Sequence, residues 1–499
     1  MTITSETAAA PGFSLDRKAR LFLWAALLGL IVIRLVAVVW LPFVDSTEAR
    51  YAEIARKMLE TGDWITPQFD YGVPFWGKPP LHTWLSALGM KAFGVGAFGA
   101  RIFIMVTGLA TLGLVYAWVR RHKVRDQALL ASVVLMSSVL FFGSTAFVMT
   151  DMAMVLGTTL SMIAFFNCAT DPRARRVWGH LFFVGVAIGL LAKGPVALVL
   201  TLIPIGGWVL LGRRWYSLSA LPWRSGLVLA AVLTLPWYIV AEIKTPGFLR
   251  YFIIGEHFER FVVPGWEGDL YGGGHERAKG MIWAYILGTF LPWTPFAALL
   301  LLRPRALRAT VSADGSGWHS YLALWVLSAL ILFTMAANIL PAYTLPSMPA
   351  AAVLLVSLWA GVLGAPGPWA RGLGAGAVGL VMVLMLAIPL LSVAAPQVLR
   401  LKTERELVVA AQARVPGISL SYLGERSYSA EFYTAGQVTF LADGDAILAL
   451  GDNDRPDAVA VPEGALDRFD PVMAADFKRI GLFGRRYLFI ERAALDPLE

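Results

Sequence analysis

The sequence predicts a mainly α-helical, polytopic membrane protein with a small α/β domain at its C-terminal end. The chain of 499 residues is 57% hydrophobic and 15% charged, with a mean hydropathy of +0.65, whereas soluble domains carry about 25% charged residues. Apolar runs of roughly 20 residues recur, which is the length that a helix needs to cross a bilayer. Beyond about residue 399 these runs stop and short β-rich segments appear.

Eleven segments have the length and composition of membrane-spanning helices. They are residues 21–42, 98–119, 127–148, 152–170, 178–193, 196–211, 224–243, 279–302, 320–337, 341–362 and 372–394. Basic residues precede the first segment and no small-residue cleavage site follows it, so we expect an uncleaved anchor. The predicted organisation is a cytoplasmic tail over residues 1–20, a transmembrane part over 21–398 with an outer loop at 43–97, and a periplasmic α/β domain over 399–499.

The charge of the connecting loops predicts which end of the bundle faces the cytoplasm. Every second connection is short and basic, and an excess of Lys and Arg marks cytoplasmic loops. These basic residues are Arg120, Arg121, Lys123, Arg125, Arg173, Arg175, Arg176, Arg213, Arg214, Arg303, Arg305 and Arg308. The other connections then emerge together on the periplasmic face of a bacterial inner membrane. Because the net charge of +8 is scattered over short loops, it favours a membrane protein over one that binds nucleic acid.

The segment from Leu399 to Glu499 alternates predicted strands with helical stretches, which indicates a small α/β domain. The strands are expected at Ile418–Leu423, Val438–Leu441, Ala446–Leu450, Ala458–Val461 and Arg486–Ile490. The helical stretches are expected at Glu404–Ala413 and Ala474–Ile480. The single cysteine, Cys168, excludes an intramolecular disulfide.

The first outer loop begins with a segment that contains more charged residues than a simple connection between two helices requires. Residues Asp45–Glu60 place apolar side chains at helical spacing opposite a polar face, which predicts a helix lying at the membrane surface. Asp45 and Glu48 fit an N-terminal capping box. The alternative is that one or both carboxylates face a cavity and serve as general base or substrate ligand.

The same loop continues into FWGKPP, residues 75–80, where Lys78 lies beside two prolines that fix the backbone. A lysine at a membrane face either snorkels to the interface or presents a point charge to a phosphate. Trp76 fits an interfacial aromatic belt or a surface that stacks on a sugar or covers a lipid tail.

Several polar residues elsewhere stand in apolar surroundings. Asp151 is either a helix-capping residue or a functional carboxylate, since carboxylates in a membrane are costly. Lys193 lies at the tip of a predicted helical hairpin, where a lysine often snorkels. His257 is either an ordinary interfacial histidine or, with Arg260 and nearby acidic residues, part of a cluster that holds an anionic head group. Tyr343 lies between two prolines that either simply begin a helix or hold its hydroxyl where it can bond a phosphate.

Six of these stretches resemble, in order, the bacterial branch of the polyprenyl-phosphate-dependent GT-C glycosyltransferases. This branch includes the lipid A 4-amino-4-deoxy-L-arabinose transferases and the bacterial relatives of the dolichyl-phosphate-mannose protein mannosyltransferases. The matching stretches are TEARYAEIARKML with GDWITP (47–67), PFWGKPPLHTWL (74–85), TDMAM (150–154), LLAKGP (190–195), PWYI with GFLRYFIIGEHFERF (236–261) and LPAYTLP (340–346). A later stretch, SAEFYTAGQ (429–437), resembles a segment of the family's outer domain.

The resemblance implies an inverting enzyme that moves a sugar from an undecaprenyl phosphate carrier to lipid A or another envelope glycan. It implies catalytic carboxylates at Glu48 and Asp151, with Asp45 as a substitute because Thr47 stands where the family often has aspartate. It also implies phosphate binding by Lys78 and Tyr343.

Six further residues complete the predicted site. Lys193, His257 and Arg260 are expected at the phosphate, and Arg50, Tyr51 and Trp76 at the sugar or lipid. Gly77 stands where the family has an acidic residue linked to a divalent metal, so no metal ligand is assigned and no other cofactor is expected.

Three alternatives remain open. A protein O-glycosyltransferase of the same family would share every motif. A transporter or flippase for a lipid-linked glycan, or a non-catalytic envelope assembly protein, would share the membrane location. Transporters place ionisable residues near the bilayer midplane, whereas here they collect at one face, which favours the transferase.

Overall fold

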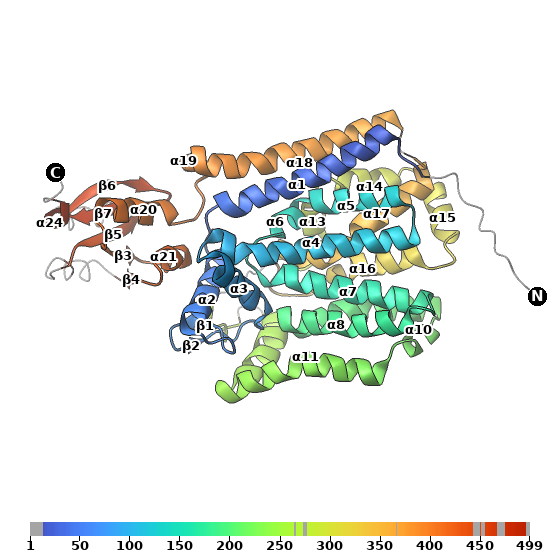
Figure 1. Ribbon diagram of the computed structural model, residues 1–499, viewed down its shortest axis with the longest axis horizontal. Coiled ribbons are helices and arrows are strands. Elements are labelled where there is room, and N and C mark those ends of the chain that lie inside the picture. Colours follow the sequence, from blue (N-terminus) through green and yellow to red (C-terminus); the bar gives the residue numbers. More distant parts are fainter. Residues whose placement is uncertain are drawn as a thin grey trace, which may run out of the picture.

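The computed structural model describes residues 13–263, 266–272, 277–365, 367–442, 450, 455–466 and 475–495. Long helices lie side by side along the molecule, and the C-terminal sheet projects beyond one end of them (Figure 1). The helices and strands of the first outer loop lie at this end, between the bundle and the sheet. The N-terminus lies at the opposite end.

Among the described residues, eight helical segments are long and apolar enough to cross a membrane. They are α1 (Arg17–Trp40), α4 (Ala97–His122), α7 (Thr150–Thr170), α8 (Arg175–Lys193), α9 (Pro195–Gly212), α11 (Trp223–Lys244), η2 (Pro341–Ser347) continued by α17 (Met348–Leu363), and α18 (Pro368–Ala394). A ninth segment is added if α13 (Met281–Thr289) and α14 (Thr294–Leu300), bent by 104°, form one span. The predicted polytopic helical fold is confirmed, while the number of eleven spans stays a prediction.

Three predicted spans coincide with broken or short helices. Residues 127–148 cover α5 (Arg125–Ser137) and α6 (Val139–Ser144), residues 279–302 cover the bent pair α13 and α14, and residues 320–337 begin within α16 (Trp318–Phe333). A broken helix frees backbone groups that need partners away from water. Here the break between α5 and α6 is joined to the break between α13 and α14 by a hydrogen bond. The amide of Val139 donates to the carbonyl of Leu291 at 2.9 Å.

The centre of the bundle is α7, which is almost wholly buried, with α8 packed closely against it. The close approach depends on glycine, because a Cβ at Gly157 would lie 2.6 Å from the backbone nitrogen of Gly189. Small residues allow helices to approach in this way inside membranes. By contrast, α11 and α18 expose many large apolar side chains along their length, as expected of helices that face lipid.

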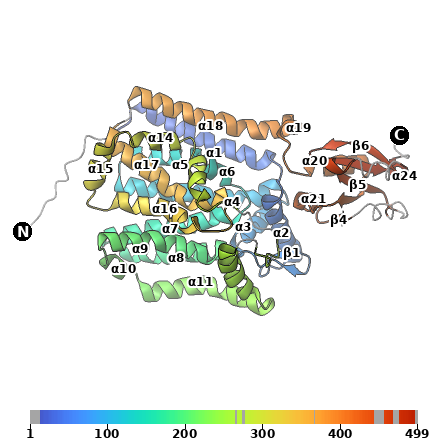
Figure 2. The same ribbon diagram turned by 180° about the vertical axis from the view of Figure 1, so that it is seen from behind.

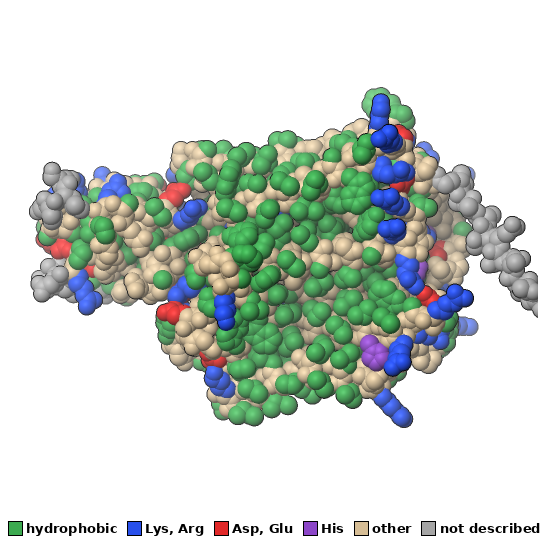
Figure 3. All heavy atoms as spheres, in the orientation of Figure 1, with side chains coloured by type: hydrophobic (Ala, Val, Ile, Leu, Met, Phe, Trp, Pro, Cys, Tyr) green, Lys and Arg blue, Asp and Glu red, His purple; other side chains and the backbone are tan. Residues whose placement is uncertain are grey.

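The predicted basic loops gather at one end of the bundle. The short helices α10 (Tyr216–Ser219) and α15 (Pro304–Ser312) lie at the end where the N-terminus emerges, in both Figure 1 and Figure 2. Figure 3 shows Lys and Arg side chains in a column along this end, with hydrophobic side chains covering the middle of the molecule. The arrangement is the one that the positive-inside pattern predicts.

The first outer loop folds into α2 (Thr47–Thr61), β1 (Gln68–Asp70), β2 (Val73–Pro74) and α3 (Leu81–Phe93). The capping-box interpretation is wrong. Ser46 is the N-cap of α2 and makes no side-chain cap bond, while the Asp45 carboxylate accepts hydrogen bonds from Ser427 and Ser429 of the C-terminal domain. The polar face of α2 is also not a free surface, since Arg56 and Lys57 are buried.

A long connection at the same end carries the π-helical segment η1 (Arg250–Glu259) and the short α12 (Arg260–Val262). After α18, the short α19 (Pro396–Leu399) leads into the C-terminal domain. That domain contains α20 (Arg405–Arg414), β3 (Ser419–Leu423), α21 (Tyr428–Tyr433), β4 (Val438–Leu441), β5 (Asp457–Pro462), η3 (Glu463–Ala465), β6 (Phe477–Phe483), β7 (Arg486–Glu491) and α24 (Arg492–Leu495).

Five strands among the described residues form one mixed sheet in the order β4-β3-β5-β7-β6. β3 is parallel to β4 and β5, whereas β7 is antiparallel to β5 and β6. The helix expected at Ala474–Ile480 is wrong, because β6 pairs with β7 there and Gly484, at a φ of 59°, turns the hairpin. Of the strand expected at Ala446–Leu450, all but Leu450 lies outside the described residues.

Candidate active site

A cavity of about 350 Å³ opens at the end of the bundle that carries the first outer loop. We call it the outer pocket. Its walls come from α2, the loop before α3, the start of α7, the α8–α9 junction, η1 with α12, the end of α16, and η2. The polar and aromatic side chains in these walls are Thr47, Arg50, Tyr51, Phe75, Lys78, Thr150, Asp151, Lys193, Glu256, His257, Arg260, Phe261, Asp269, Tyr271, Phe333, Asn338 and Tyr343.

Most of the predicted site residues meet in this pocket although they come from distant parts of the chain. Those lining it are Arg50, Tyr51, Lys78, Asp151, Lys193, His257, Arg260 and Tyr343. Asp45, Glu48 and Trp76 do not line it. All three predicted carboxylates lie at this end of the bundle, but only Asp151 lines the pocket together with the basic residues.

Lys78 is bound at one wall by the carboxylate of Glu256. Its Nζ donates to Oε2 of Glu256 at 2.7 Å and to the carbonyl of Gly77 at 2.6 Å. Arg260 donates to both oxygens of Glu256, at 3.0 and 3.1 Å, and pairs with Asp269 at 3.2 Å. Burial alone would raise the pKa of Glu256, but Lys78 and Arg260 outweigh it and hold that pKa below its usual range.

A second ion pair lies across the pocket between α7 and α8. Nζ of Lys193 donates to Oδ1 of Asp151 at 2.6 Å, and the Thr150 hydroxyl contacts Oδ2 of Asp151 at 3.2 Å. Nζ of Lys193 also lies 4.8 Å from the centre of the Tyr343 ring. Lys193 points into the pocket because Gly194 turns the chain with a φ of 79° directly after it. Asp151 makes no helix-capping bond, so the capping interpretation is not supported.

His257 and Tyr343 complete this side of the pocket. The ring nitrogens of His257 lie 2.7 Å from the carbonyl oxygen of Phe252 and 3.1 Å from that of Lys193. Burial lowers the pKa of His257. Both nitrogens thus already have backbone neighbours, and His257 fixes the α8–α9 turn. Tyr343 packs on Phe333, with ring centres 4.7 Å apart.

Arg50 differs from the other pocket cations because it pairs with no carboxylate in the part of the chain that the structure describes. Its Nη1 donates to the carbonyl of Tyr271 at 2.7 Å, and its guanidinium lies 5.3 Å from the ring centre of Tyr51. Its Nε is buried without a hydrogen-bond partner. Four cations line the pocket against three carboxylates, so one positive charge remains and favours an anionic ligand.

The two remaining predicted carboxylates are held by other contacts. Glu48 is buried and accepts two hydrogen bonds from Arg101 of α4, at 2.8 and 2.7 Å. Asp45 binds the C-terminal domain, as described above. Trp76 donates from Nε1 to Thr245 at 3.1 Å. These contacts hold the loop in place, and the catalytic roles of Asp45 and Glu48 stay predictions.

Sequence reasoning missed the acidic partners of the basic residues. Glu256 stands in the cluster that contains His257 and Arg260, but its partner Lys78 is 178 positions away. Asp269 and Tyr271 lie in an irregular loop where no periodicity marks them. One signal could have indicated these acidic partners. The predicted site residues contain more lysine and arginine than carboxylates, and charges in low-dielectric surroundings need partners of the opposite sign.

The residues present do not fit a divalent metal. Gly77 offers no ligand at the position where the resemblance places one, and Glu256 is already bound by Lys78 and Arg260. Within the described ranges, no three His, Cys, Asp or Glu side chains come together as a metal site. No step below therefore involves a metal.

The chain is similar to known glycosyltransferases over its membrane part. A family model described as dolichyl-phosphate-mannose-protein mannosyltransferase matches residues 20–252. The undecaprenyl phosphate-alpha-4-amino-4-deoxy-L-arabinose arabinosyl transferase of Aeromonas salmonicida is 30% identical over 352 residues, covering 67% of this chain and 59% of the relative. The enzyme of that name from Edwardsiella ictaluri is 32% identical over 317 residues, covering 62% of this chain and 54% of the relative.

The predicted resemblance is thus confirmed, although the chain spans less than two thirds of the length of these relatives. The fold matches the crystal structure of ArnT from Cupriavidus metallidurans bound to undecaprenyl phosphate. The TM-score is 0.76 at 20% sequence identity, with 97% of this chain and 99% of that chain covered. The match confirms the fold class of a helical membrane bundle with a small C-terminal α/β domain.

Proposed function

We propose that this protein transfers a sugar from a polyprenyl phosphate carrier to an acceptor in the bacterial envelope, with inversion of the anomeric centre. The observation that carries the proposal is the outer pocket, where four cations and the carboxylate Asp151 meet at one end of a membrane bundle. The relatives are named for undecaprenyl phosphate and a pentose, so the proposed donor is an undecaprenyl phosphate pentose. The proposed acceptor is lipid A or another lipopolysaccharide glycan.

The cations of the pocket suit the leaving group of this reaction. When the bond between the anomeric carbon and the phosphate oxygen breaks, both electrons stay with the phosphate, and its negative charge increases. Fixed cations stabilise such charge in the transition state. Lys78, Arg260 and Arg50 are the proposed phosphate ligands, because each lines the pocket with its charged end held by an identified contact.

Asp151 is the proposed base for the acceptor. An acceptor hydroxyl forms the new bond to the anomeric carbon on the face opposite the phosphate, which produces the inversion, and its proton passes to a carboxylate. Lys193 holds one oxygen of Asp151, which fixes the direction of the carboxylate. Glu256 is less suited to this role because Lys78 and Arg260 already occupy both of its oxygens.

The proposed orientation places the basic end of the bundle in the cytoplasm and the outer pocket in the periplasm. Single-cysteine labelling tests it, since Cys168→Ser removes the one natural cysteine. A membrane-impermeant maleimide is expected to label Thr61→Cys in intact spheroplasts and Arg173→Cys only after permeabilisation. The reverse pattern would overturn the orientation.

Reconstitution separates the transferase from a transporter. Purified protein in proteoliposomes receives undecaprenyl phosphate carrying 4-amino-4-deoxy-L-arabinose, with either lipid A or a peptide as acceptor. The proposal expects free undecaprenyl phosphate in equal amount to glycosylated lipid A. Movement of the intact carrier across the bilayer without cleavage would refute it, and glycosylation of the peptide alone would make the acceptor a protein.

A further inference from the structure

Helix α2 lies between the outer pocket and the C-terminal domain. Thr47, Arg50 and Tyr51 of its first turns line the pocket. One to two turns later, Glu53 and Lys57 belong to a buried ion network that reaches Glu431 of α21. The C-terminal domain therefore contacts, through this network, the same helix that carries pocket residues.

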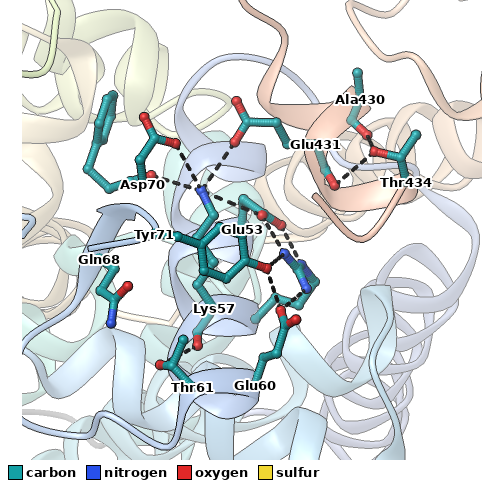
Figure 4. Close-up of polar contacts among 12 residues, drawn as sticks. Glu53, Lys57, Glu60, Thr61, Gln68, Asp70, Tyr71, Ala430, Glu431 and Thr434 are labelled. Carbon is teal, nitrogen blue, oxygen red and sulfur yellow. Dashed lines mark hydrogen bonds and ion pairs between the residues drawn. The ribbon is translucent and has the colours of Figure 1, made fainter. Parts of the chain in front are cut away.

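At the centre of the network are Glu53, Lys57 and Glu431, whose buried charges are all paired (Figure 4). Nζ of Lys57 lies 3.4 Å from Glu431, 3.7 Å from Glu53 and 3.3 Å from Asp70, and it donates to the carbonyl of Phe69 at 2.9 Å. Burial raises the pKa of Glu53 despite its basic neighbours. Buried pairs add little net stability, but a buried charge without its partner is costly. Such a network therefore specifies one position of the domain on α2.

Arg426, which precedes α21, extends the network toward the pocket wall. It donates to both oxygens of Asp70, at 2.8 and 2.5 Å, and to Glu431. Its guanidinium lies 4.6 Å from the ring centre of Phe69 and 5.2 Å from that of Tyr428. A planar cation fixed by two carboxylates thus holds both rings.

Those two rings contact residues of the pocket. Phe69 lies 5.1 Å from Tyr271 and 6.4 Å from Phe75, measured between ring centres, and both of these residues line the pocket. Tyr428 lies 5.8 Å from the guanidinium of Arg50. Arg50 has no carboxylate partner among the described residues. The orientation of its guanidinium therefore depends on the carbonyl of Tyr271 and on the rings of Tyr51 and Tyr428. Of these, Tyr428 belongs to the C-terminal domain.

We propose that the C-terminal domain is a positioning part of the outer pocket, in which Tyr428, held by Arg426, directs Arg50 toward the phosphate of the donor. The identity of that anion rests on the proposed function. Tyr428 touches no substrate in this account and acts through Arg50. The domain thereby shapes the site for a lipid-linked phosphate, rather than only extending from the membrane.

The role of Tyr428 can be tested by substitution without detaching the C-terminal domain, because other contacts hold the domain on the first outer loop. The Asp45 carboxylate accepts from Ser427 and Ser429, and the Tyr433 hydroxyl bonds the amide of Phe43 at 2.8 Å. Tyr428→Ala removes the ring that contacts Arg50, and Tyr428→Phe keeps it. Tyr487→Ala is the matched control, since Tyr487 lies on β7, where it contacts Arg479.

A double-mutant cycle with Arg50→Ala measures whether the two residues act together. Tyr428→Ala is expected to lower kcat/KM for the polyprenyl phosphate sugar about fivefold to tenfold, the size of a partly buried cation–π contact. The loss combines a higher KM with a lower kcat, because Arg50 is a proposed ligand of the leaving phosphate. In the Arg50→Ala background the same change has no further effect. Tyr428→Phe restores most of kcat/KM, since it keeps the ring and loses only the hydroxyl that also interacts with Arg50. Tyr487→Ala leaves kcat/KM at the wild-type value.

Equal losses from Tyr428→Ala in both backgrounds would overturn the proposal, as would a wild-type kcat/KM in Tyr428→Ala. Hydrogen exchange supplies a readout that does not need turnover: in Tyr428→Ala, amides of residues 47–52 exchange faster while those of β3 do not change. If the wild-type protein turns over no donor, the proposed function is wrong. Hydrogen exchange over residues 47–52 then tests, without any turnover, whether Tyr428 positions the start of α2.

Discussion

Lys193 donates a 2.6 Å hydrogen bond to Oδ1 of Asp151, and this contact joins the last residue of α8 to the first turn of α7 inside the outer pocket. Both side chains are largely buried. The pair joins the two helix ends, and in the proposed reaction Asp151 is also the base for the acceptor. Mutation can separate these two roles.

Asp151→Asn is expected to lower transfer by about 10²- to 10⁴-fold, the range for loss of a general base. It also leaves Lys193 as a buried cation without its partner, which lowers stability. The double variant Asp151→Asn with Lys193→Met removes both charges, so its melting temperature should return toward the wild-type value while transfer stays lost. Recovery of transfer in the double variant would contradict the role of Asp151 as base.

Substitution of Glu48 can also distinguish a structural role from a catalytic one. Glu48→Gln leaves the guanidinium of Arg101 buried with its ion pair broken, which is expected to cost about 3 kcal/mol of stability. Thermal unfolding in detergent measures the loss. Arg101→Met in the same chain should offset only part of it, because Arg101 also donates to the carbonyls of Val38, Leu41 and Pro42. Lost transfer at an unchanged melting temperature would instead assign a catalytic role to Glu48.

The junction of the C-terminal domain is expected to be sensitive to pH. Burial raises the pKa of Glu404 to about 7, with Arg486 opposing the shift and the charge of Asp45 adding to it. Because the folded state holds the proton more tightly than the unfolded state, the stabilisation is complete below the ordinary carboxyl pKa. It is lost as pH rises through about 7, and its full size is about 3 kcal/mol.

The melting temperature should therefore fall between pH 5 and 8, and Glu404→Gln should flatten this part of the profile relative to the wild type. The comparison of the two profiles isolates Glu404 from other titrating groups. Parallel profiles in the two proteins would rule out Glu404 as the origin of the pH dependence.

Chelation tests the absence of a metal step. Since Gly77 supplies no ligand and Glu256 is bound by Lys78 and Arg260, treatment with EDTA is expected to leave transfer unchanged. The measurement is the initial rate before and after dialysis against the chelator. A loss of rate that added Mg²⁺, Mn²⁺ or Zn²⁺ restores would show that a metal participates.

Hydropathy predicted the helical bundle because lipid-facing helices must be apolar along a length that the bilayer fixes. It did not predict the breaks after Ser137 and Thr289, where backbone groups find partners in a neighbouring segment rather than within their own helix. The strand β6 was assigned as helix for a similar reason. The stretch assigned as helix contains Ala475, Lys478 and Arg479, which favour a helix locally, whereas pairing with β7 decides the structure.

The cations of the site were more predictable than its anions. Lys78, Lys193 and Arg260 stand out because charge is rare near membrane-spanning sequence. The partners Glu256 and Asp269, and the contact of Tyr428 with Arg50, depend on how distant segments fold together. Asp45 shows the reverse error, since a carboxylate that looked available binds the C-terminal domain.

The most direct test of the central claim is the rate of release of undecaprenyl phosphate from its sugar-linked form, in the presence of lipid A, by Lys78→Met and Lys91→Met. Lys91 is an exposed lysine near the end of α3 and does not line the pocket. Glu256 keeps Arg260 as a partner in Lys78→Met, so the protein should fold. We expect Lys78→Met to lose about 10²-fold in rate and Lys91→Met to match the wild type. A wild-type rate in Lys78→Met, or an equal loss in both variants, would contradict transfer in the outer pocket.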